Sequence, residues 1–226
     1  MKKFFIFSLI ALLSVAAQAQ IVSSKSSRIT VTKEAQPKGD DYNRLYFGFA
    51  NYSPNGEMSR ESEINNFNGF KFGYLHGISL TKKLPLFLEV GGELQYGTQS
   101  ESDDDEKWTY NLLSLNIPLN LSYKYSFSKG LYIAPYAGIG FRCFMLGKAK
   151  YTDLDKDRSV SYNCFSSDDM DGDTFKRFQV GGNFGVNVGY KAFNFNLGYS
   201  IYSPVYNDYG YKFKVNTFTV GIGFNF

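Results

Sequence analysis

The sequence predicts an all-β fold, an eight-stranded antiparallel up-and-down β-barrel over residues 42–226. Eight segments alternate apolar and polar side chains, which is the period of a β-strand. The breaks between them are alternately short and long. The chain is also 18% aromatic, with 22 Phe and 18 Tyr, an unusually high share for a water-soluble domain. Together these observations favour strands with one face in lipid, and thus a transmembrane β-barrel.

The first four segments each show an outward and an inward row. Their expected spans are 42–52, 67–80, 84–97 and 108–125. The second segment has an apolar row of Phe70, Phe72, Tyr74, Ile78 and Leu80. The fourth has Leu113, Leu115, Ile117, Leu119, Leu121, Tyr123 and Tyr125, set against Ser114, Asn116, Pro118, Asn120, Ser122 and Lys124. One face of each suits hydrocarbon and the other suits a polar interior.

The last four segments repeat the scheme, with expected spans 130–147, 174–190, 192–203 and 213–226. Their outward rows include Ile139, Phe141 and Met145; then Phe178, Val180, Phe184, Val186 and Val188; then Phe193, Phe195, Leu197, Tyr199 and Ile201; and finally Phe218, Val220, Ile222, Phe224 and Phe226. All eight segments reach the roughly 9–11 residues that a tilted strand needs to cross a bilayer. Length and alternation therefore predict the same architecture.

The breaks predict an orientation. Residues 81–83, 126–129 and Lys191 form short turns, whereas 53–66, 98–107, 148–173 and 204–212 are long and polar. Short turns on one side and long loops on the other are typical of outer-membrane barrels, with an even number of strands. Closing the ring also removes edges that would otherwise be unpaired in lipid.

The N-terminal region predicts export. Lys2 and Lys3 precede an apolar run, Phe4–Ala16, and Ala17-Gln18-Ala19 is a small-x-small cleavage site, so residues 1–19 are expected to be a signal peptide. Residues 20–41 are polar and lack a sustained period, which predicts a flexible periplasmic extension. No later run offers about 20 consecutive apolar residues, so a membrane role would use strands rather than helices.

These features, with the terminal stretch VGIGFNF, resemble the small eight-stranded outer-membrane β-barrels of the OmpX and PorT-like kind. The resemblance covers residues 42–226 and implies the outer membrane of a Gram-negative bacterium, surrounded by lipid and lipopolysaccharide. It also implies that the barrel-assembly machinery recognises the last strand through an assembly signal. That signal would be the outward row Phe218, Val220, Ile222, Phe224 and Phe226.

Charged residues fall on the inward faces. A polar plug of the lumen is expected from Lys71, Glu89, Glu93, Arg142 and Arg177, because eight strands enclose a space that side chains can fill. A hairpin centred on Lys82 would place Lys71 directly opposite Glu93 as an ion pair. The inward tyrosines Tyr46 and Tyr132 would share this interior.

Cys143 and Cys164 are the only cysteines, and the exported compartment is oxidising. A disulfide would fold the long loop that holds Cys164 back over the rim. The alternative is that Cys143 is a small apolar residue on the outward face of its strand. The sequence leaves both readings open.

Several function classes fit poorly. His76 is the only histidine and has outward parity, which argues against an enzyme with a histidine base. The Asp-rich stretches 153–157 and 169–173 lack the glycine and glutamate of a calcium loop, so they are read as an anionic rim, without a metal or cofactor. The formal charge of +3 falls by two to +1 without Lys2 and Lys3, which gives no basic field for nucleic acid.

The expected function is non-enzymatic: a structural, adhesive or assembly role through the outward loops, around a lumen filled by side chains. Two alternatives are a narrow channel or small-solute transporter, and an accessory subunit of an outer-membrane secretion complex. Each alternative implies a distinct observation: conduction through the lumen, or an envelope protein that copurifies.

Overall fold

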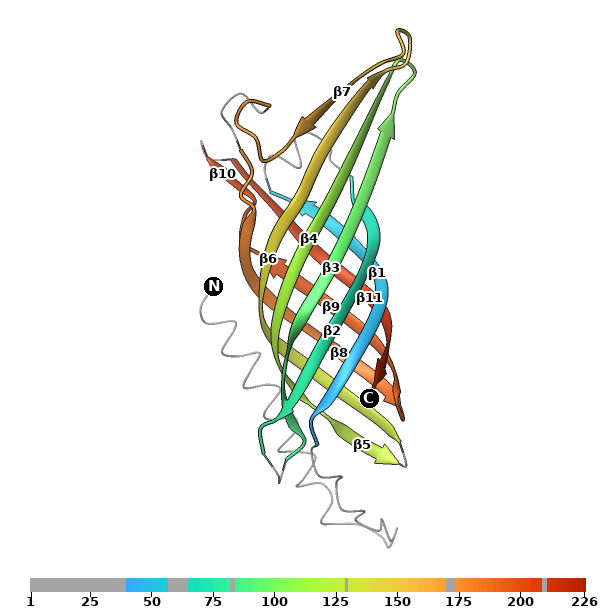
Figure 1. Cartoon of the computed structure of the whole chain (residues 1–226), viewed down its shortest axis with the longest axis vertical. Coiled ribbons are helices and arrows are strands. Elements are labelled where there is room, and N and C mark those ends of the chain that lie inside the picture. The colour runs from blue at the N-terminus through green and yellow to red at the C-terminus, as the bar shows by residue number, and fades with distance from the viewer. Residues whose placement is uncertain (1–39, 57–64, 82–83, 129, 170–173, 209–210) are drawn as a thin grey trace, which may run out of the picture. The chain divides into compact units, whose positions relative to one another are not determined.

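The protein forms a closed ring of eight antiparallel strands in a computed structural model that describes residues 40–56, 65–81, 84–128, 130–169, 174–208 and 211–226. The expected signal peptide, residues 1–19, and nearly all of the expected extension lie outside these residues. The ring strands are β1 (Tyr42–Asn55), β2 (Phe67–Ser79), β3 (Leu86–Ser102), β4 (Glu106–Tyr123), β6 (Leu131–Asp153), β8 (Phe178–Tyr190), β9 (Phe193–Tyr202) and β11 (Tyr211–Asn225). The eight-stranded antiparallel barrel is confirmed, as Figure 1 shows.

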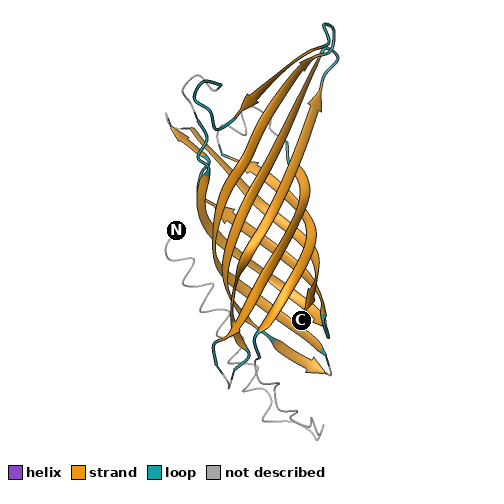
Figure 2. Ribbon diagram, viewed as in Figure 1, coloured by secondary structure: helices purple, strands orange, loops and turns teal. Residues whose placement is uncertain are grey.

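Three short strands are added to the ring: β5 (Tyr125–Ser128) and β7 (Arg158–Asn163), which pair with β6, and β10 (Tyr206–Asp208), which pairs with β11. Figure 2 shows that strands make up almost all of the described chain. Among the described residues, no helix has the length and apolar character to cross a membrane.

The first and last ring strands close the barrel. β1 pairs with β11 from Arg44 opposite Asn225 to Asn55 opposite Lys214. Beyond this ladder, the backbones of Asn43 and Phe226 exchange two hydrogen bonds, each 2.9 Å long. The ring therefore starts and finishes at the same end, as an even number of strands requires. We call this the turn end, and the opposite end, which carries β7 and β10, the loop end.

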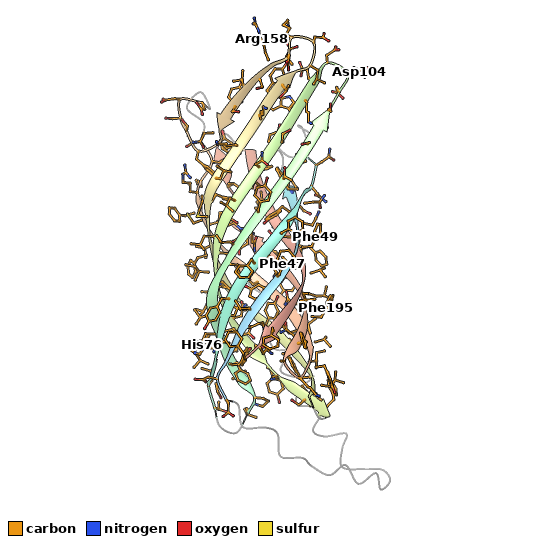
Figure 3. The ribbon with its side chains drawn as sticks, turned by 45° about the vertical axis from the view of Figure 1, so that its right-hand side comes forward. Phe47, Phe49, His76, Asp104, Arg158 and Phe195 are labelled. Carbon is orange, nitrogen blue, oxygen red and sulfur yellow. The ribbon has the colours of Figure 1, made fainter. Side chains whose placement is uncertain are left out.

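The outer face of the ring is apolar. Phe47, Phe70 and Ile222 are 51%, 57% and 66% exposed, respectively, and alternate along their strands with buried inward residues. Figure 3 shows Phe47, Phe49 and Phe195 pointing away from the barrel. In water this surface would oppose folding, but in a bilayer it contacts hydrocarbon. The outward rows predicted from the sequence are thus the lipid-facing surface.

The loop end differs from the expectation. Residues 98–107 and 148–173 were expected to be long loops, but β3 runs on to Ser102, β4 begins at Glu106, and β6 continues to Asp153 before turning into β7. Four strands thus extend past the last residues that β2 pairs, forming what we call the projecting sheet: 99–102, 106–111, 148–153 and 158–163. Its outward-facing side chains are polar, whereas Trp108, Tyr110 and Tyr151 lie on its inward face, so backbone pairing persists where the lipid-facing row stops.

A β-bulge lies where β6 leaves the ring. The register between β4 and β6 shifts at Leu113/Ser114, which leaves Met145 as an extra residue on β6. Arg142 and Phe144 face inward before the bulge, and Ala149 faces inward after it. A bulge inserts one residue and thereby changes the parity of the strand. The inward row of β6 consequently continues in register with the inward row of β4.

Candidate functional site

The interior of the barrel has two layers that differ in chemistry. The inward row of β4 is polar toward the turn end, at Ser114, Asn116, Asn120 and Ser122, and apolar toward the loop end, at Leu112, Tyr110 and Trp108. The same change occurs on β11, where Thr217 and Thr219 are followed by the buried residues Val215 and Phe213. We call these the polar layer and the apolar cup.

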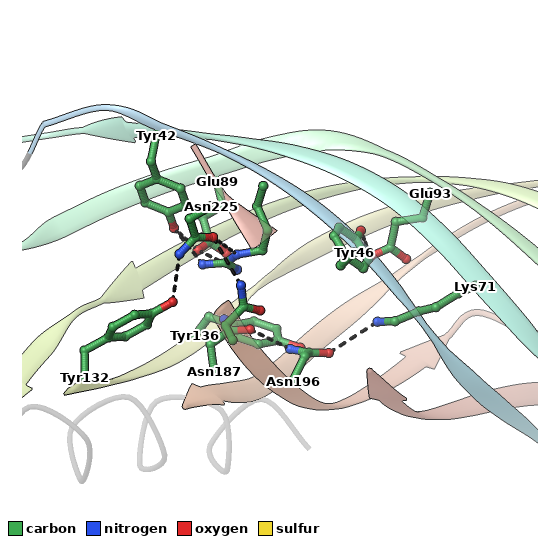
Figure 4. Close-up of polar contacts among 12 residues, drawn as sticks. Tyr42, Tyr46, Lys71, Glu89, Glu93, Tyr132, Tyr136, Asn187, Asn196 and Asn225 are labelled. Carbon is green, nitrogen blue, oxygen red and sulfur yellow. Dashed lines mark hydrogen bonds and ion pairs between the residues drawn. The ribbon is translucent and has the colours of Figure 1, made fainter. Parts of the chain in front are cut away.

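A buried ion pair lies in the polar layer, near the turn end. The Arg44 guanidinium contacts a carboxylate oxygen of Glu89 at 3.3 Å, and both side chains are almost fully buried. The Tyr42 hydroxyl donates to Glu89, and Arg44 Nε donates to Asn225 Oδ1 at 2.9 Å. Figure 4 shows Tyr42, Glu89 and Asn225 close together in this network. A buried charge is costly unless it is paired and hydrogen-bonded. Strands β1, β3 and β11 are thus joined by one polar network.

The expected ion pair between Lys71 and Glu93 is wrong. Lys71 lies opposite Gln95, and Glu93 lies opposite Gly73, so the register of β2 and β3 differs by two residues from that of a hairpin centred on Lys82. A shift of two residues leaves every side chain on its expected face, so alternation cannot detect it. Residues 82 and 83 lie outside the described residues.

Lys71 and Glu93 have other partners. The Lys71 ammonium donates to Asn196 Oδ1 at 3.3 Å and to Thr219 Oγ1 at 3.2 Å, on the far wall of the lumen. Glu93 accepts hydrogen bonds from the Tyr46 hydroxyl and, at 2.9 Å, from Gln95 Nε2. Each charge is therefore held by neutral groups instead of by the other.

Arg142 lies between the two layers and is 1% exposed. Its guanidinium donates to Asn116 Oδ1 at 3.0 Å, to the Val215 carbonyl at 3.2 Å and to Thr217 Oγ1 at 2.7 Å. It also lies 3.8 Å from the centroid of the Tyr202 ring, a cation–π contact. No ion pair joins Arg142 to a carboxylate in the described part of the chain.

Arg177 contacts residues at the loop end of the barrel instead of the polar plug in which it was expected. β8 begins one residue later, at Phe178, and the Arg177 side chain is only half-buried. It donates to the Phe144 carbonyl at 3.2 Å and lies 4.5 Å from the centroid of the Phe165 ring. Alternation assigns a face only to residues within a strand, and Arg177 precedes the first residue of β8. The four other predicted side chains, those of Lys71, Glu89, Glu93 and Arg142, line the interior.

Little space is left in the polar layer. A gap of about 20 Å³ lies among Arg44, Lys71, Glu89 and their neighbours. Asn120, Asn187 and Asn194 border this gap, and each has a buried amide atom without a hydrogen-bond partner in the protein. A space of this size admits about one water molecule, which buried amide groups of this kind bind.

Glycines opposite tyrosines help to fill the polar layer. Gly73 lies opposite Tyr46 and Gly189 opposite Tyr132, and a Cβ on either glycine would overlap the tyrosine ring. The rings lie flat across the neighbouring strand because the glycine has no side chain there. Glycine therefore sets the tyrosine positions that bring Tyr46 to Glu93.

The apolar cup was not predicted. It encloses a cavity of about 330 Å³ near the loop end, lined by residues of β2, β4, β6, β7, β11 and the segments beside them. Its base includes Phe67, Phe144 and Val215, which are at most 4% exposed. Trp108 lies nearer the loop end, 5.1 Å from Tyr151 and 6.3 Å from Tyr162 between ring centroids. Extending the inward parity of Ser114 back to Leu112, Tyr110 and Trp108 would have revealed this apolar row.

The two cysteines are free thiols, so the disulfide that the sequence permitted is absent. Cys143 precedes the bulge and faces outward, whereas Cys164 is buried and lines the apolar cup. The two side chains thus lie on opposite sides of the barrel wall. Burial in the cup raises the pKa of the Cys164 thiol, which disfavours the reactive thiolate.

The other candidate residues lie at the surface. His76 Nδ1 lies 2.9 Å from Asn43 Oδ1, which also accepts from the Tyr74 hydroxyl at 2.6 Å, on the outside of β1 and β2. Asp153 pairs with Lys156 at 2.9 Å in the turn before β7, and Figure 3 shows Asp104 and Arg158 at the loop end. Among the described residues, no group of three His, Cys, Asp or Glu side chains is arranged to hold a metal ion.

The expected assembly signal lies on the outward face of β11. Phe218, Ile222 and Phe224 are between 43% and 66% exposed, Phe226 is 60% exposed, and Val220 is half-buried in the same row. Their lipid-facing position agrees with the expected row.

Comparisons with solved structures find small barrels at low identity. The Ail attachment invasion locus protein of Yersinia pestis, in complex with the heparin analogue sucrose octasulfate, is 14% identical over 83% of this chain and 99% of its own, with a TM-score of 0.49. Neisserial surface protein A is 13% identical over 82% and 97%, with a TM-score of 0.43. The N-terminal barrel of Pseudomonas aeruginosa OprF is 14% identical over 84% and 99%, with a TM-score of 0.34. No curated protein matches the chain.

The family assignment rests on a different comparison. The family model described as "Outer membrane protein beta-barrel domain" matches residues 5–226, nearly the whole chain. The closed ring of eight strands and its apolar outer face are what such a domain requires. The chain therefore belongs to the outer membrane protein beta-barrel domain family, whose place is the lipid and lipopolysaccharide environment of the Gram-negative outer membrane.

Proposed function

We propose that this protein is a non-conducting, non-enzymatic scaffold that holds the projecting sheet outside the outer membrane as a binding surface. The observation that carries the proposal is the continuation of three ring strands, β3, β4 and β6, past the closed ring, with β7 paired beside β6. A barrel that only spanned the membrane would not need them. Export would remove residues 1–19, and the barrel-assembly machinery would recognise the outward row of β11.

The projecting sheet has two edges that lack a neighbouring strand among the described residues. β7 pairs only with β6, and residues 99–102 of β3 pair only with β4. Open edges present backbone N–H and C=O groups that can pair with another chain. Both edges and the exposed Arg158 favour contact with an extracellular or envelope partner, as an adhesive role requires.

The polar layer supports the non-conducting part of the proposal. Lys71, Glu89, Glu93 and Arg142 would form a plug, since Lys71 and Arg142 bond to residues of other strands across the lumen and the gap that Lys71, Glu89 and Glu93 border measures only about 20 Å³. A steady aqueous path would have to break the Arg44–Glu89 pair and the bonds of Arg142. A narrow channel is therefore the weaker candidate.

Conductance separates the scaffold from the channel. The purified full-length protein in a planar bilayer should show no steady single-channel steps. Reproducible, ion-selective steps that change in a Glu93→Ala variant would contradict the plug and favour the channel.

Site-specific photo-crosslinking on intact cells tests the binding surface. A photo-reactive residue at Ser161, on the exposed part of β7, should give discrete cross-linked products. The comparison position is Ser126, a half-buried serine of β5 at the turn end. Products at Ser126 alone would contradict an external binding surface and would favour the accessory subunit of a secretion complex.

A further inference from the structure

The apolar cup lies between the polar layer and the projecting sheet, whose inward residues Trp108, Tyr110 and Tyr162 line it, and the proposed function gives this cavity no role. Its volume of about 330 Å³ lies within the range of about 300–1,000 Å³ for small-molecule pockets. Protein interiors are normally packed without voids larger than a water molecule. An engineered apolar cavity of about 150 Å³ already binds benzene. A cavity of this size in an otherwise filled barrel therefore indicates a ligand.

We propose that the apolar cup binds one alkyl chain, either of a free fatty acid or of a membrane lipid. This proposal goes beyond the binding surface of the projecting sheet and does not depend on it.

The lining selects against polar ligands. Phenylalanine, valine and leucine side chains make up most of the walls, including Phe67, Phe144, Phe213 and Val215. Lys148 is the one charged residue among the lining residues, and its side chain is exposed on the opposite side of β6 from the inward Ala149. A sugar or an anion would lose its hydration here without gaining partners, whereas an alkyl chain needs none.

The floor of the cup explains why the alkyl chain of the ligand would end there. Arg142 lies beneath Phe144, 5.6 Å from the centroid of its ring, and its guanidinium is already bonded to Asn116, Val215 and Thr217. A methyl end could contact Phe144 but could not pass into the polar layer. The head group would therefore remain toward the loop end.

Trp108 provides a direct reporter, because it lines the cup and is the only tryptophan of the chain. Bromine quenches tryptophan fluorescence on contact. The first arm titrates the full-length protein in lipid nanodiscs with 10-bromodecanoic acid. The second arm uses nanodiscs whose phospholipid acyl chains are brominated, without added fatty acid. Quenching in the first arm alone identifies a free alkyl acid, and quenching in the second identifies a lipid chain.

Two variants make the result specific. Ala149→Phe fills the cup from an inward position that is 8% exposed. Ser161→Phe adds the same ring to the exposed face of β7, one residue from Tyr162, and is the matched control. We expect saturable quenching in the wild type and in Ser161→Phe, and at least tenfold weaker quenching in Ala149→Phe. Equal quenching in Ala149→Phe, or none in either arm for the wild type, would overturn the proposal.

A second measurement leaves the cup unmutated, in case Ala149→Phe does not fold. In a Cys143→Ser variant, Cys164 is the only thiol, and it lines the cup. Decanoic acid should slow the labelling of Cys164 by a small thiol reagent at least fivefold, while butyric acid should not. An unchanged labelling rate with decanoic acid at saturating concentration would contradict occupation of the cup.

Discussion

Removing Glu89 should leave a cation buried in the barrel without its partner. In Glu89→Ala, Arg44 keeps its hydrogen bond to Asn225 but loses the carboxylate 3.3 Å away, and the Tyr42 hydroxyl loses its acceptor. Breaking a buried ion pair from one side costs about 3–5 kcal/mol. We therefore expect Glu89→Ala and Arg44→Ala each to lower the free energy of unfolding by about 3 kcal/mol or more.

The double variant isolates the interaction. Without Arg44, the loss of Glu89 no longer strands a charge, so the double variant should cost less than the two single variants together, by about 2 kcal/mol. Urea unfolding in detergent micelles, followed by circular dichroism, measures all four proteins. The free energies must come from transitions that are reversible and two-state.

A second cycle, on Lys71 and Glu93, is the matched control. These two residues are inward and charged but lie in different ladder positions, and each is bonded to neutral partners. Their coupling should be less than half that of Arg44 and Glu89. Additive effects at Arg44 and Glu89, or an equal coupling at Lys71 and Glu93, would refute the assignment of the buried ion pair.

Three further predictions concern topology, assembly and packing. Trypsin added to intact cells should cut after Lys156 or Arg158, at the loop end, and leave Lys191 intact; cleavage at Lys191 alone would reverse the orientation. Phe226→Asp should reduce the folded protein in the outer membrane several-fold, whereas Phe127→Asp, at an outward position of similar exposure on β5, should not; equal losses would exclude a specific assembly signal. Gly73→Ala should lower the free energy of unfolding by about 1–3 kcal/mol through its clash with Tyr46. Gly92→Ala, where an added Cβ meets no atom within 4 Å, should cost much less, and a similar loss in both would contradict the clash.

The sequence by itself determined the fold class and the faces of the strands. A strand turns its side chains alternately to two sides, so the row from Phe218 to Phe226 had to share one face whatever its neighbours were. The predicted segments agree with the ring strands at the turn end to within a few residues. Alternation is a local property, and it needs no knowledge of pairing.

The loop end was less predictable because its strands lack a lipid-facing row. Residues 98–102 are polar on both faces, and 148–153 carry Lys148, Lys150 and Thr152 on the outward face, so neither stretch shows the lipid-facing row of a membrane strand. Their strand structure comes from backbone hydrogen bonds to β4 and β7, which depend on what lies beside them. Arg177 was likewise assigned to the inward face by alternation, although it precedes Phe178, the first residue of β8.

Only the tertiary structure decided which inward residues meet. Lys71 was expected to pair with Glu93, but a register two residues away gives the same faces and different partners. Arg44 and Glu89 come from β1 and β3, which are not neighbours in the ring, so no hairpin rule relates them. The apolar cup likewise combines side chains of four ring strands and β7. The face on which a side chain lies follows from the sequence of its own strand. Contacts across the lumen depend on register, on closure of the ring and on the bulge in β6, and these arise only when all eight strands pair.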